Sequence, residues 1–219
     1  MRARDNPFRS DRILSLRYRL QGGSWEGLLG RFEELGRRAA IVGPQGSGKT
    51  TLLEDLAPHF RRGGYRVRDL RLDTETPRFH ESFLDDFSRT LGSRDLILFD
   101  GAEQLGRRAW FRFLRRSRTA GGLIATLHRP GRLPTLWATR TSPELLERLV
   151  EQILGDRARD VRFLTSRLYE KHGGNLREAL RELYDVYAAV NEESGRSGDV
   201  SPLPAAPREQ GAMARGPCC

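Results

Sequence analysis

One eight-residue segment limits the possible folds of this 219-residue chain more than any other feature. It reads Gly43-Pro44-Gln45-Gly46-Ser47-Gly48-Lys49-Thr50 and fits the phosphate-loop pattern GxxxxGK[ST]. Glycines allow such a loop to turn its backbone N–H groups inward, where they form a nest for phosphate oxygens. The helix expected to begin near Lys49 adds its positive N-terminal end. The segment therefore predicts a nucleotide-binding α/β fold.

Two side chains of this loop carry specific chemistry. Of the 38 lysine and arginine residues, only Lys49 and Lys171 are lysines, so a lysine at this position is informative. We expect Lys49 to reach the β- and γ-phosphates and the Thr50 hydroxyl to ligate Mg²⁺. The residues predicted to bind the nucleotide are Gly43, Pro44, Gln45, Gly46, Ser47, Gly48, Lys49, Thr50 and Thr51.

Strand and helix signals alternate around the loop. Strands are expected at Ala39–Gly43, Tyr65–Leu72, Asp95–Asp100, Leu123–Leu127 and Thr135–Thr139. Helices are expected at Lys49–Arg62, Arg78–Leu91 and Arg107–Arg118, with a shorter one in residues 24–35. The alternation predicts a three-layer core, in which helices cover both faces of a mostly parallel five-stranded sheet.

The pattern changes at Ser142-Pro143, where a serine cap and a proline at the first helical position predict a helix start. From there we expect only helices, at 143–154, 158–171 and 175–191. These changes divide the chain into four parts. They are an N-terminal lead-in and helix (1–36), a phosphate-loop core (37–141), a small helical lid (142–192) and a tail (193–219) whose composition predicts disorder.

The apolar strand Leu96–Phe99 ends at Asp100, and a phosphate-loop site needs an acid at the end of a neighbouring strand. We expect Asp100 to hold the metal, the alternative being an aspartate that only terminates the strand. Glu103 is the nearest carboxylate able to polarise an attacking water. The alternative for Glu103 is that it is an exposed loop carboxylate without a catalytic role.

Together these motifs resemble the AAA+ and STAND group of phosphate-loop ATPases, over about residues 24–190. The strand Leu96–Asp100 resembles the Walker B motif of this group. Gly101, directly after Asp100, matches the STAND form of that motif, whereas AAA+ proper has a glutamate there. Gln104 stands where STAND members often carry an acid. The resemblance implies ATP and Mg²⁺ as cofactors and a helical lid over the nucleotide.

The resemblance also implies roles at further positions. A polar sensor residue is expected at the end of the next strand, where Thr126 and His128 are the candidates. Arg177, in a Gly-Gly-Asn-Leu-Arg segment, matches the lid arginine that reaches the γ-phosphate. Asn6–Arg9, which reads as a turn, is placed to line the adenine pocket. For each of these side chains the alternative is a structural role.

The formal charge of +9 favours anionic partners, although the preference for arginine is equally explained by genome base composition. The helix expected at Arg107–Arg118 interleaves basic and aromatic residues, which leaves two interpretations. Either it binds nucleic acid, or it covers the sheet with Trp110, Phe113 and Leu114 and exposes its arginines.

Several classes of protein are not expected. No apolar run reaches the roughly 18 residues of a membrane helix, and no signal peptide follows the first charges, so we expect a cytoplasmic protein without a membrane partner. The only cysteines, Cys218 and Cys219, end the sequence, which excludes a disulfide-stapled scaffold.

The leading hypothesis is an ATP-binding and ATP-hydrolysing protein in which Lys49, Glu103, Arg177, Thr126 and His128 serve the reaction and Thr50 and Asp100 hold the metal. Lid closure would be read by an unidentified protein or nucleic-acid partner. One alternative is a small-molecule or nucleoside kinase, with Asp73–Leu91 binding the acceptor. Another is a module that binds nucleotide without hydrolysing it.

Overall fold

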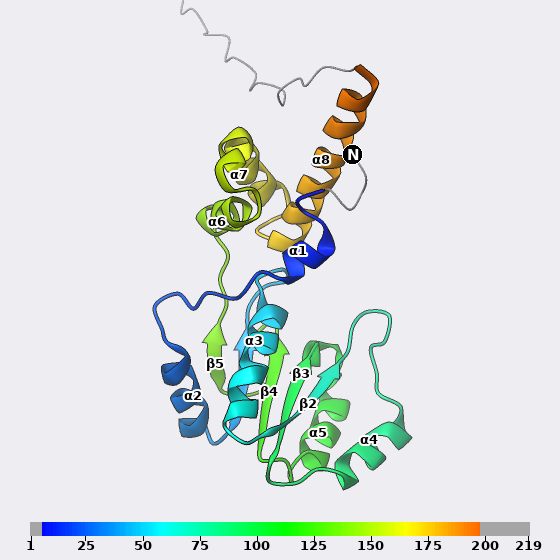
Figure 1. Cartoon of the computed structure of the whole chain (residues 1–219). Coiled ribbons are helices and arrows are strands. Elements are labelled where there is room, and N and C mark those ends of the chain that lie inside the picture. Colours follow the sequence, from blue (N-terminus) through cyan, green and yellow to red (C-terminus); the bar gives the residue numbers. More distant parts are fainter. Residues whose placement is uncertain (1–5, 198–219) are drawn as a thin grey trace, which may run out of the picture.

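A fully parallel five-stranded sheet forms the centre of the computed structural model, which describes residues 6–197 (Figure 1). Its strands are β1 (Arg38–Val42), β2 (Arg66–Arg71), β3 (Asp95–Asp100), β4 (Gly122–Leu127) and β5 (Thr135–Ala138). Their order across the sheet is β2-β3-β4-β1-β5, and every neighbouring pair is parallel. The predicted α/β class and five-stranded sheet are confirmed, and all strands end at one edge.

Helices cover both faces of this sheet, as predicted. The flanking helices are α2 (Trp25–Glu34) and α3 (Lys49–Arg62) on one face, and α4 (Glu81–Arg89) and α5 (Arg107–Arg116) on the other. Because successive side chains of a strand point to opposite faces, each central strand contributes side chains to the hydrophobic clusters on both faces of the sheet. In β3, Leu98 belongs to the cluster with α3, whereas the next residue, Phe99, packs on Phe113 of α5 with ring centroids 4.9 Å apart.

The rest of the chain forms a helical lid beyond the carboxyl ends of the strands (Figure 1). It comprises α6 (Pro143–Leu154), the 3₁₀ segment η3 (Gly155–Val161), α7 (Arg162–Lys171) and α8 (Leu176–Ser197). The predicted cap is present, since Ser142 Oγ accepts a hydrogen bond of 3.2 Å from the backbone N–H of Leu145. The lid has its own hydrophobic cluster, separate from those of the sheet.

The start of the described chain belongs to this lid and corrects the prediction for Asn6–Arg9. Phe8 is buried in the lid cluster, and Asn6 Nδ2 donates a 2.9 Å hydrogen bond to the carbonyl of Tyr184 on α8. A short helix, α1 (Ser10–Leu14), follows and was not predicted. Burial of Phe8 explains the difference, because a large apolar side chain beside a helical cluster is stabilised inside it. These residues therefore anchor the lid.

Three predicted helices have different bounds in the structure. The helix predicted at Arg78–Leu91 begins only at Glu81. Phe79 lies before it in non-helical backbone, and its ring packs on Phe99 and Phe113. The helix predicted to end at Arg118 ends at Arg116. The helix predicted from residue 158 begins at Arg162, because Gly155 takes a φ of +60° and the chain continues as η3.

Helix α8 extends beyond its predicted end. It continues to Ser197, so five residues of the segment predicted as a disordered tail, 193–197, are helical. Glutamates at 192 and 193 favour a helix, and the first proline beyond them is Pro202. The remaining tail and its two cysteines lie outside the described residues. Among the helices of residues 6–197, none is both long and apolar enough to cross a membrane.

Candidate functional site

The phosphate loop connects the end of β1 to the start of α3, where the sequence places it. Gly46 and Gly48 have φ values of +71° and +84°, which a residue with a Cβ rarely adopts. Ser47 closes the loop by donating to the carbonyl of Pro44 at 2.7 Å, and its hydroxyl lies 2.6 Å from that of Thr139 at the end of β5. The loop is therefore fixed from both sides.

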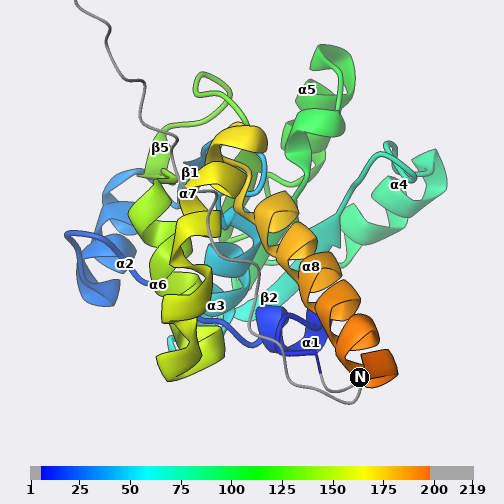
Figure 2. The ribbon, with the colours of Figure 1, turned by 90° about the horizontal axis from the view of Figure 1, so that it is seen from above.

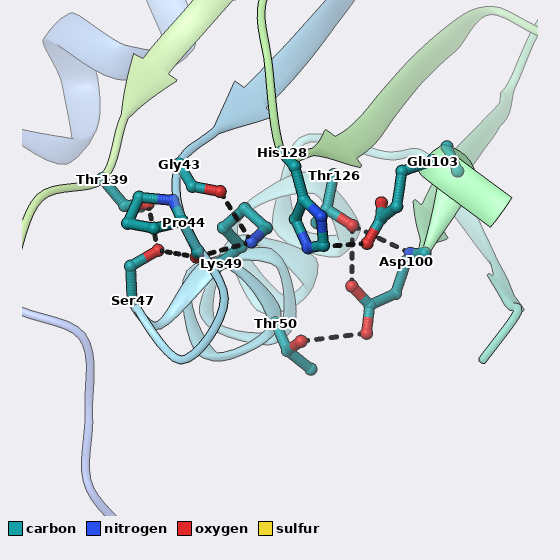
Figure 3. Close-up of polar contacts among 12 residues, drawn as sticks. Gly43, Pro44, Ser47, Lys49, Thr50, Asp100, Glu103, Thr126, His128 and Thr139 are labelled. Carbon is teal, nitrogen blue, oxygen red and sulfur yellow. Dashed lines mark hydrogen bonds and ion pairs between the residues drawn. The ribbon is translucent and has the colours of Figure 1, made fainter. Parts of the chain in front are cut away.

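Lys49 lies inside this loop with only 7% of its surface exposed. Its Nζ donates to the carbonyls of Gly43 at 2.9 Å and Pro44 at 2.8 Å (Figure 3). Burial lowers the pKa of Lys49, the carboxylates of Glu103 and Asp100 act in the opposite direction, and Arg177 lowers the pKa further. An anion at the loop would favour the charged ammonium.

A second set of contacts surrounds Asp100 at the end of β3. Thr50 Oγ1 donates to Asp100 Oδ2 at 2.9 Å, and Thr126 Oγ1 donates to Asp100 Oδ1 at 2.8 Å (Figure 3). Thr126 in turn accepts from the backbone N–H of Gly101 at 2.9 Å. Arg71 Nε lies 3.8 Å from the same carboxylate. Residues from α3, β2, β3 and β4 thus meet at one carboxyl group.

Glu103 and His128 form a pair beside this set. Glu103 lies in the 3₁₀ turn η2 (Ala102–Gln104), and its Oε1 is 3.1 Å from Nε2 of His128, just beyond β4 (Figure 3). The other oxygen, Oε2, is buried and has no hydrogen-bond partner. An unsatisfied buried carboxylate oxygen requires an explanation. A water, or a group on a bound ligand, would satisfy it.

A cavity of about 410 Å³ opens beside the loop, between the sheet and the lid. Its walls come from three parts of the chain: the loop and the first turns of α3, the segment between Ile13 and Arg19, and helices α6 and α8. Thr51, Tyr18 and Arg177 are among the lining residues. Such a volume is in the range of small-molecule sites.

The structure brings most of the predicted site residues to this place. Lys49, Thr50 and Asp100 lie together, with Thr126 touching Asp100 and His128 touching Glu103. Both sensor candidates therefore have polar partners at the site, although of different kinds. Asn6–Arg9 does not line the cavity; the residues that follow it do. Gln45 is exposed and is not among the lining residues.

Three residues of the site were not predicted. Thr139 fixes Ser47; its signal was its place at the end of the predicted fifth strand. Tyr18 lines the cavity next to Gly48, and its hydroxyl accepts a 3.2 Å hydrogen bond from Trp137 Nε1. Asn175 lies so close to Gly46 that a Cβ there would overlap its side chain. Asn175 stands in the predicted Gly-Gly-Asn-Leu-Arg segment, whereas nothing in the sequence singles out Tyr18.

The donors at Asp100 fit a magnesium ion. Mg²⁺ prefers oxygen ligands and is commonly held by one or two carboxylates together with substrate phosphates. The adjoining hydroxyl of Thr50 and carboxylate of Asp100 supply two such oxygens. Over the described part of the chain, no group of three or more His, Cys, Asp or Glu side chains is placed to hold a metal.

Comparison with known proteins gives structural neighbours only. No family model and no curated protein matches the sequence. Two mutant forms of RuvB from Thermotoga maritima match the fold. One has a TM-score of 0.52 at 13% identity and covers 87% of this chain and 70% of its own. The other has a TM-score of 0.48 at 11% identity and covers 82% and 66%. The first likeness shows a phosphate-loop NTPase fold.

Proposed function

We propose that this chain binds ATP with Mg²⁺ and hydrolyses it, as an AAA+/STAND-like ATPase whose lid closes on the nucleotide. One observation carries the proposal: Lys49, Thr50 and Asp100 converge at the carboxyl edge of the sheet, beside a 410 Å³ cavity. Phosphoryl transfer needs a loop that binds the phosphates, a cation beside them and oxygen ligands for a metal ion. The phosphate loop, Lys49, and the pair of Thr50 and Asp100 supply these three parts.

Each of these groups has a distinct task. The backbone N–H groups of the loop and Lys49 Nζ bind the β- and γ-phosphates, and the Lys49 ammonium exchanges its two carbonyl contacts for phosphate oxygens. Thr50 and Asp100 would hold Mg²⁺, whose charge would offset that of the phosphates. Thr126 fixes the orientation of Asp100.

The pair of Glu103 and His128 serves the attacking water. Glu103 Oε2, which has no partner, accepts a hydrogen bond from the water and then its proton, while Oε1 stays bound to His128. His128 acts here as a positioning residue. From the lid, Arg177 reaches the γ-phosphate and couples its presence to lid closure.

Two other functions use the same loop. A kinase would need an acceptor site in residues 73–91, but none of the residues lining the cavity comes from that segment. A module that binds ATP without hydrolysing it would need Glu103 to stay bound to His128 with no water at Oε2. The pairing of Glu103 with His128 supports the non-hydrolysing module more than the kinase.

Phosphate release from ATP and Mg²⁺, with no acceptor added, tests the proposal. We expect release by the full chain and none by Lys49→Ala, while Lys171→Ala, which alters the only other lysine, retains activity. Lys171 pairs with Glu182 on the lid surface and is a matched control. ATP affinity is measured separately by calorimetry. Binding without release would support the non-hydrolysing module, and release unchanged in Lys49→Ala would contradict the proposal.

A further inference from the structure

We propose that the outward face of helix α5 binds single-stranded nucleic acid. This α5 face consists of Arg107, Arg108, Phe111, Arg112 and Arg115. The inference goes beyond the proposed ATPase function and does not depend on it, because it rests on a different surface.

Helix α5 has two opposite sides. Trp110 and Phe113 are 4% and 1% exposed and pack on Phe99 of the sheet. The interpretation that α5 covers the sheet with Trp110 and Phe113 and exposes its arginines agrees with this burial, but it does not account for an exposed aromatic ring. Phe111 is 68% exposed. Residues three and four apart are neighbours on a helix surface, so Arg107, Arg108 and Arg115 surround the Phe111 ring.

Ion pairing does not explain three of the four arginines of this face. Helix α5 contains no acidic residue, and no carboxylate in residues 6–197 for which the structure describes a side chain forms an ion pair with Arg107, Arg108 or Arg115. Arginines elsewhere do have such partners, as in the pairs of Arg66 with Asp95 and Arg17 with Asp55. Base composition explains many arginines, but it does not explain why Arg107, Arg108 and Arg115 gather on one helix face without a carboxylate partner among the described side chains.

Helix stability does not explain the cluster either. Arg107 and Arg108 lie in the first turn, where positive side chains oppose the helix dipole. Arg108 and Arg112 are also four residues apart, and like charges at this spacing destabilise a helix. Phe111, at 68% exposed, also buries little apolar surface on folding. The α5 face therefore has the composition of a binding surface.

The chemistry of the face fits an unpaired nucleic-acid strand. Guanidinium groups bind phosphates, and an exposed aromatic ring stacks on a base. The bases of a duplex stack on one another and are closed to a ring standing on a helix surface. Phe111 in the middle of the arginines is the feature that favours a single strand over an acidic protein or an anionic membrane.

The α5 face is accessible, and the helix that carries it begins close to Glu103 in the chain. In Figures 1 and 2, α5 lies away from lid helices α6–α8, so the lid does not cover it. Its N-terminus follows η2, which contains Glu103. Arg132 connects the two segments, donating to the carbonyl of Ala102 at 2.9 Å with its guanidinium 5.6 Å from the Trp110 ring centroid.

Fluorescence anisotropy of a labelled 20-nucleotide single strand of mixed sequence, titrated with the full chain, tests the inference. We expect Phe111→Ala to raise Kd about fivefold or more, and Phe111→Tyr, which keeps the ring, to bind as the unchanged protein does. Removing two charges in Arg107→Gln/Arg115→Gln should weaken binding at least about tenfold. It should also reduce the slope of log Kd against log salt by about 1.4, because single strands lose about 0.7 per phosphate contact.

A matched control removes two charges elsewhere. Arg61→Gln/Arg62→Gln alters exposed arginines at the far end of α3 and should leave Kd nearly unchanged. Thermal melting checks that every variant is folded. Equal weakening by both double variants, tighter binding to duplex than to single strand, or binding only to acidic peptides or phosphatidylserine vesicles would each overturn the inference.

Discussion

Among the single residues of the site, Thr126 shows how one hydroxyl group fixes the carboxylate of Asp100, the proposed magnesium ligand. Its Oγ1 accepts from the backbone N–H of Gly101 and donates to Asp100, so its proton is committed to the carboxylate. The side chain is buried, which strengthens both contacts and makes their loss costly. Thr126 is therefore a positioning residue for the proposed magnesium ligand.

Replacing this hydroxyl without changing the shape of the side chain separates positioning from packing. Thr126→Val should lower the free energy of unfolding by about 2 kcal/mol, because a hydrogen bond to a charged group is lost and a buried N–H is left unpaired. It should also raise the Mg²⁺ concentration needed for half-maximal phosphate release. Thr126→Ser should restore the Mg²⁺ dependence. A Val variant that is less stable but has the original Mg²⁺ dependence would limit Thr126 to a structural role.

The residues of this site differ in how far the sequence predicts them. Lys49, Thr50 and Asp100 are predictable because a loop pattern and a strand end fix their places along the chain. Thr139 also stands at a predicted strand end, but its contact with Ser47 is not predictable, since it joins residues 92 positions apart and depends on β5 lying next to β1. Tyr18 precedes the core in a segment without periodicity, so only tertiary packing places it in the cavity wall.

At the scale of elements, the N-terminus of α8 meets the phosphate loop. Asn175 Oδ1 accepts a 3.3 Å hydrogen bond from the N–H of Glu178 and so caps the helix. The same side chain lies against Gly46, and the glycine leaves room for it. Helix α8 and the loop therefore meet at one residue, which belongs to the lid by sequence and to the candidate nucleotide site by position.

Two substitutions at Asn175 should have opposite effects. Asn175→Ala removes the cap and should lower the free energy of unfolding by about 1 kcal/mol, with ATP affinity nearly unchanged. Asn175→Asp keeps the cap but places a negative charge beside the phosphates, so ATP affinity should fall at least about tenfold. Urea denaturation and calorimetry measure the two quantities. If both variants lose affinity equally, contact with the loop and not charge governs binding.

Whole elements were easier to predict than their ends. Continuous apolar runs reveal the central strands β1, β3 and β4, because these are buried on both faces, whereas the edge strands β2 and β5 are partly exposed. The end of a helix depends instead on a few residues whose tertiary contacts decide the matter. Phe79 packs on the sheet and shortens α4, a packing preference that no local pattern reveals.

In the molecule as a whole, the N-terminal segment connects the lid to the sheet. Phe8 is buried among lid helices, and its ring centroid lies 5.1 Å from that of Tyr187 on α8. Ten residues after Phe8, the backbone N–H of Tyr18 donates a 2.6 Å hydrogen bond to Asp55 of α3. Asp55 also accepts a 2.7 Å hydrogen bond from Arg17 Nη1. The cavity lies between these two attachments, so its width depends on both.

This arrangement predicts that the lid can lose its packing while the sheet stays folded. Phe8→Ala leaves a cavity in the lid cluster and should destabilise the lid by about 3–5 kcal/mol. In hydrogen exchange, amides of α6 and α8 should then lose protection, while those of β1, β3 and β4, which belong to other clusters, should keep it. Phe8→Leu should show a weaker form of the same pattern. ATP affinity should fall with lid protection, because two lid helices line the cavity. Equal loss of protection in the sheet would mean that lid and sheet unfold as one cooperative unit.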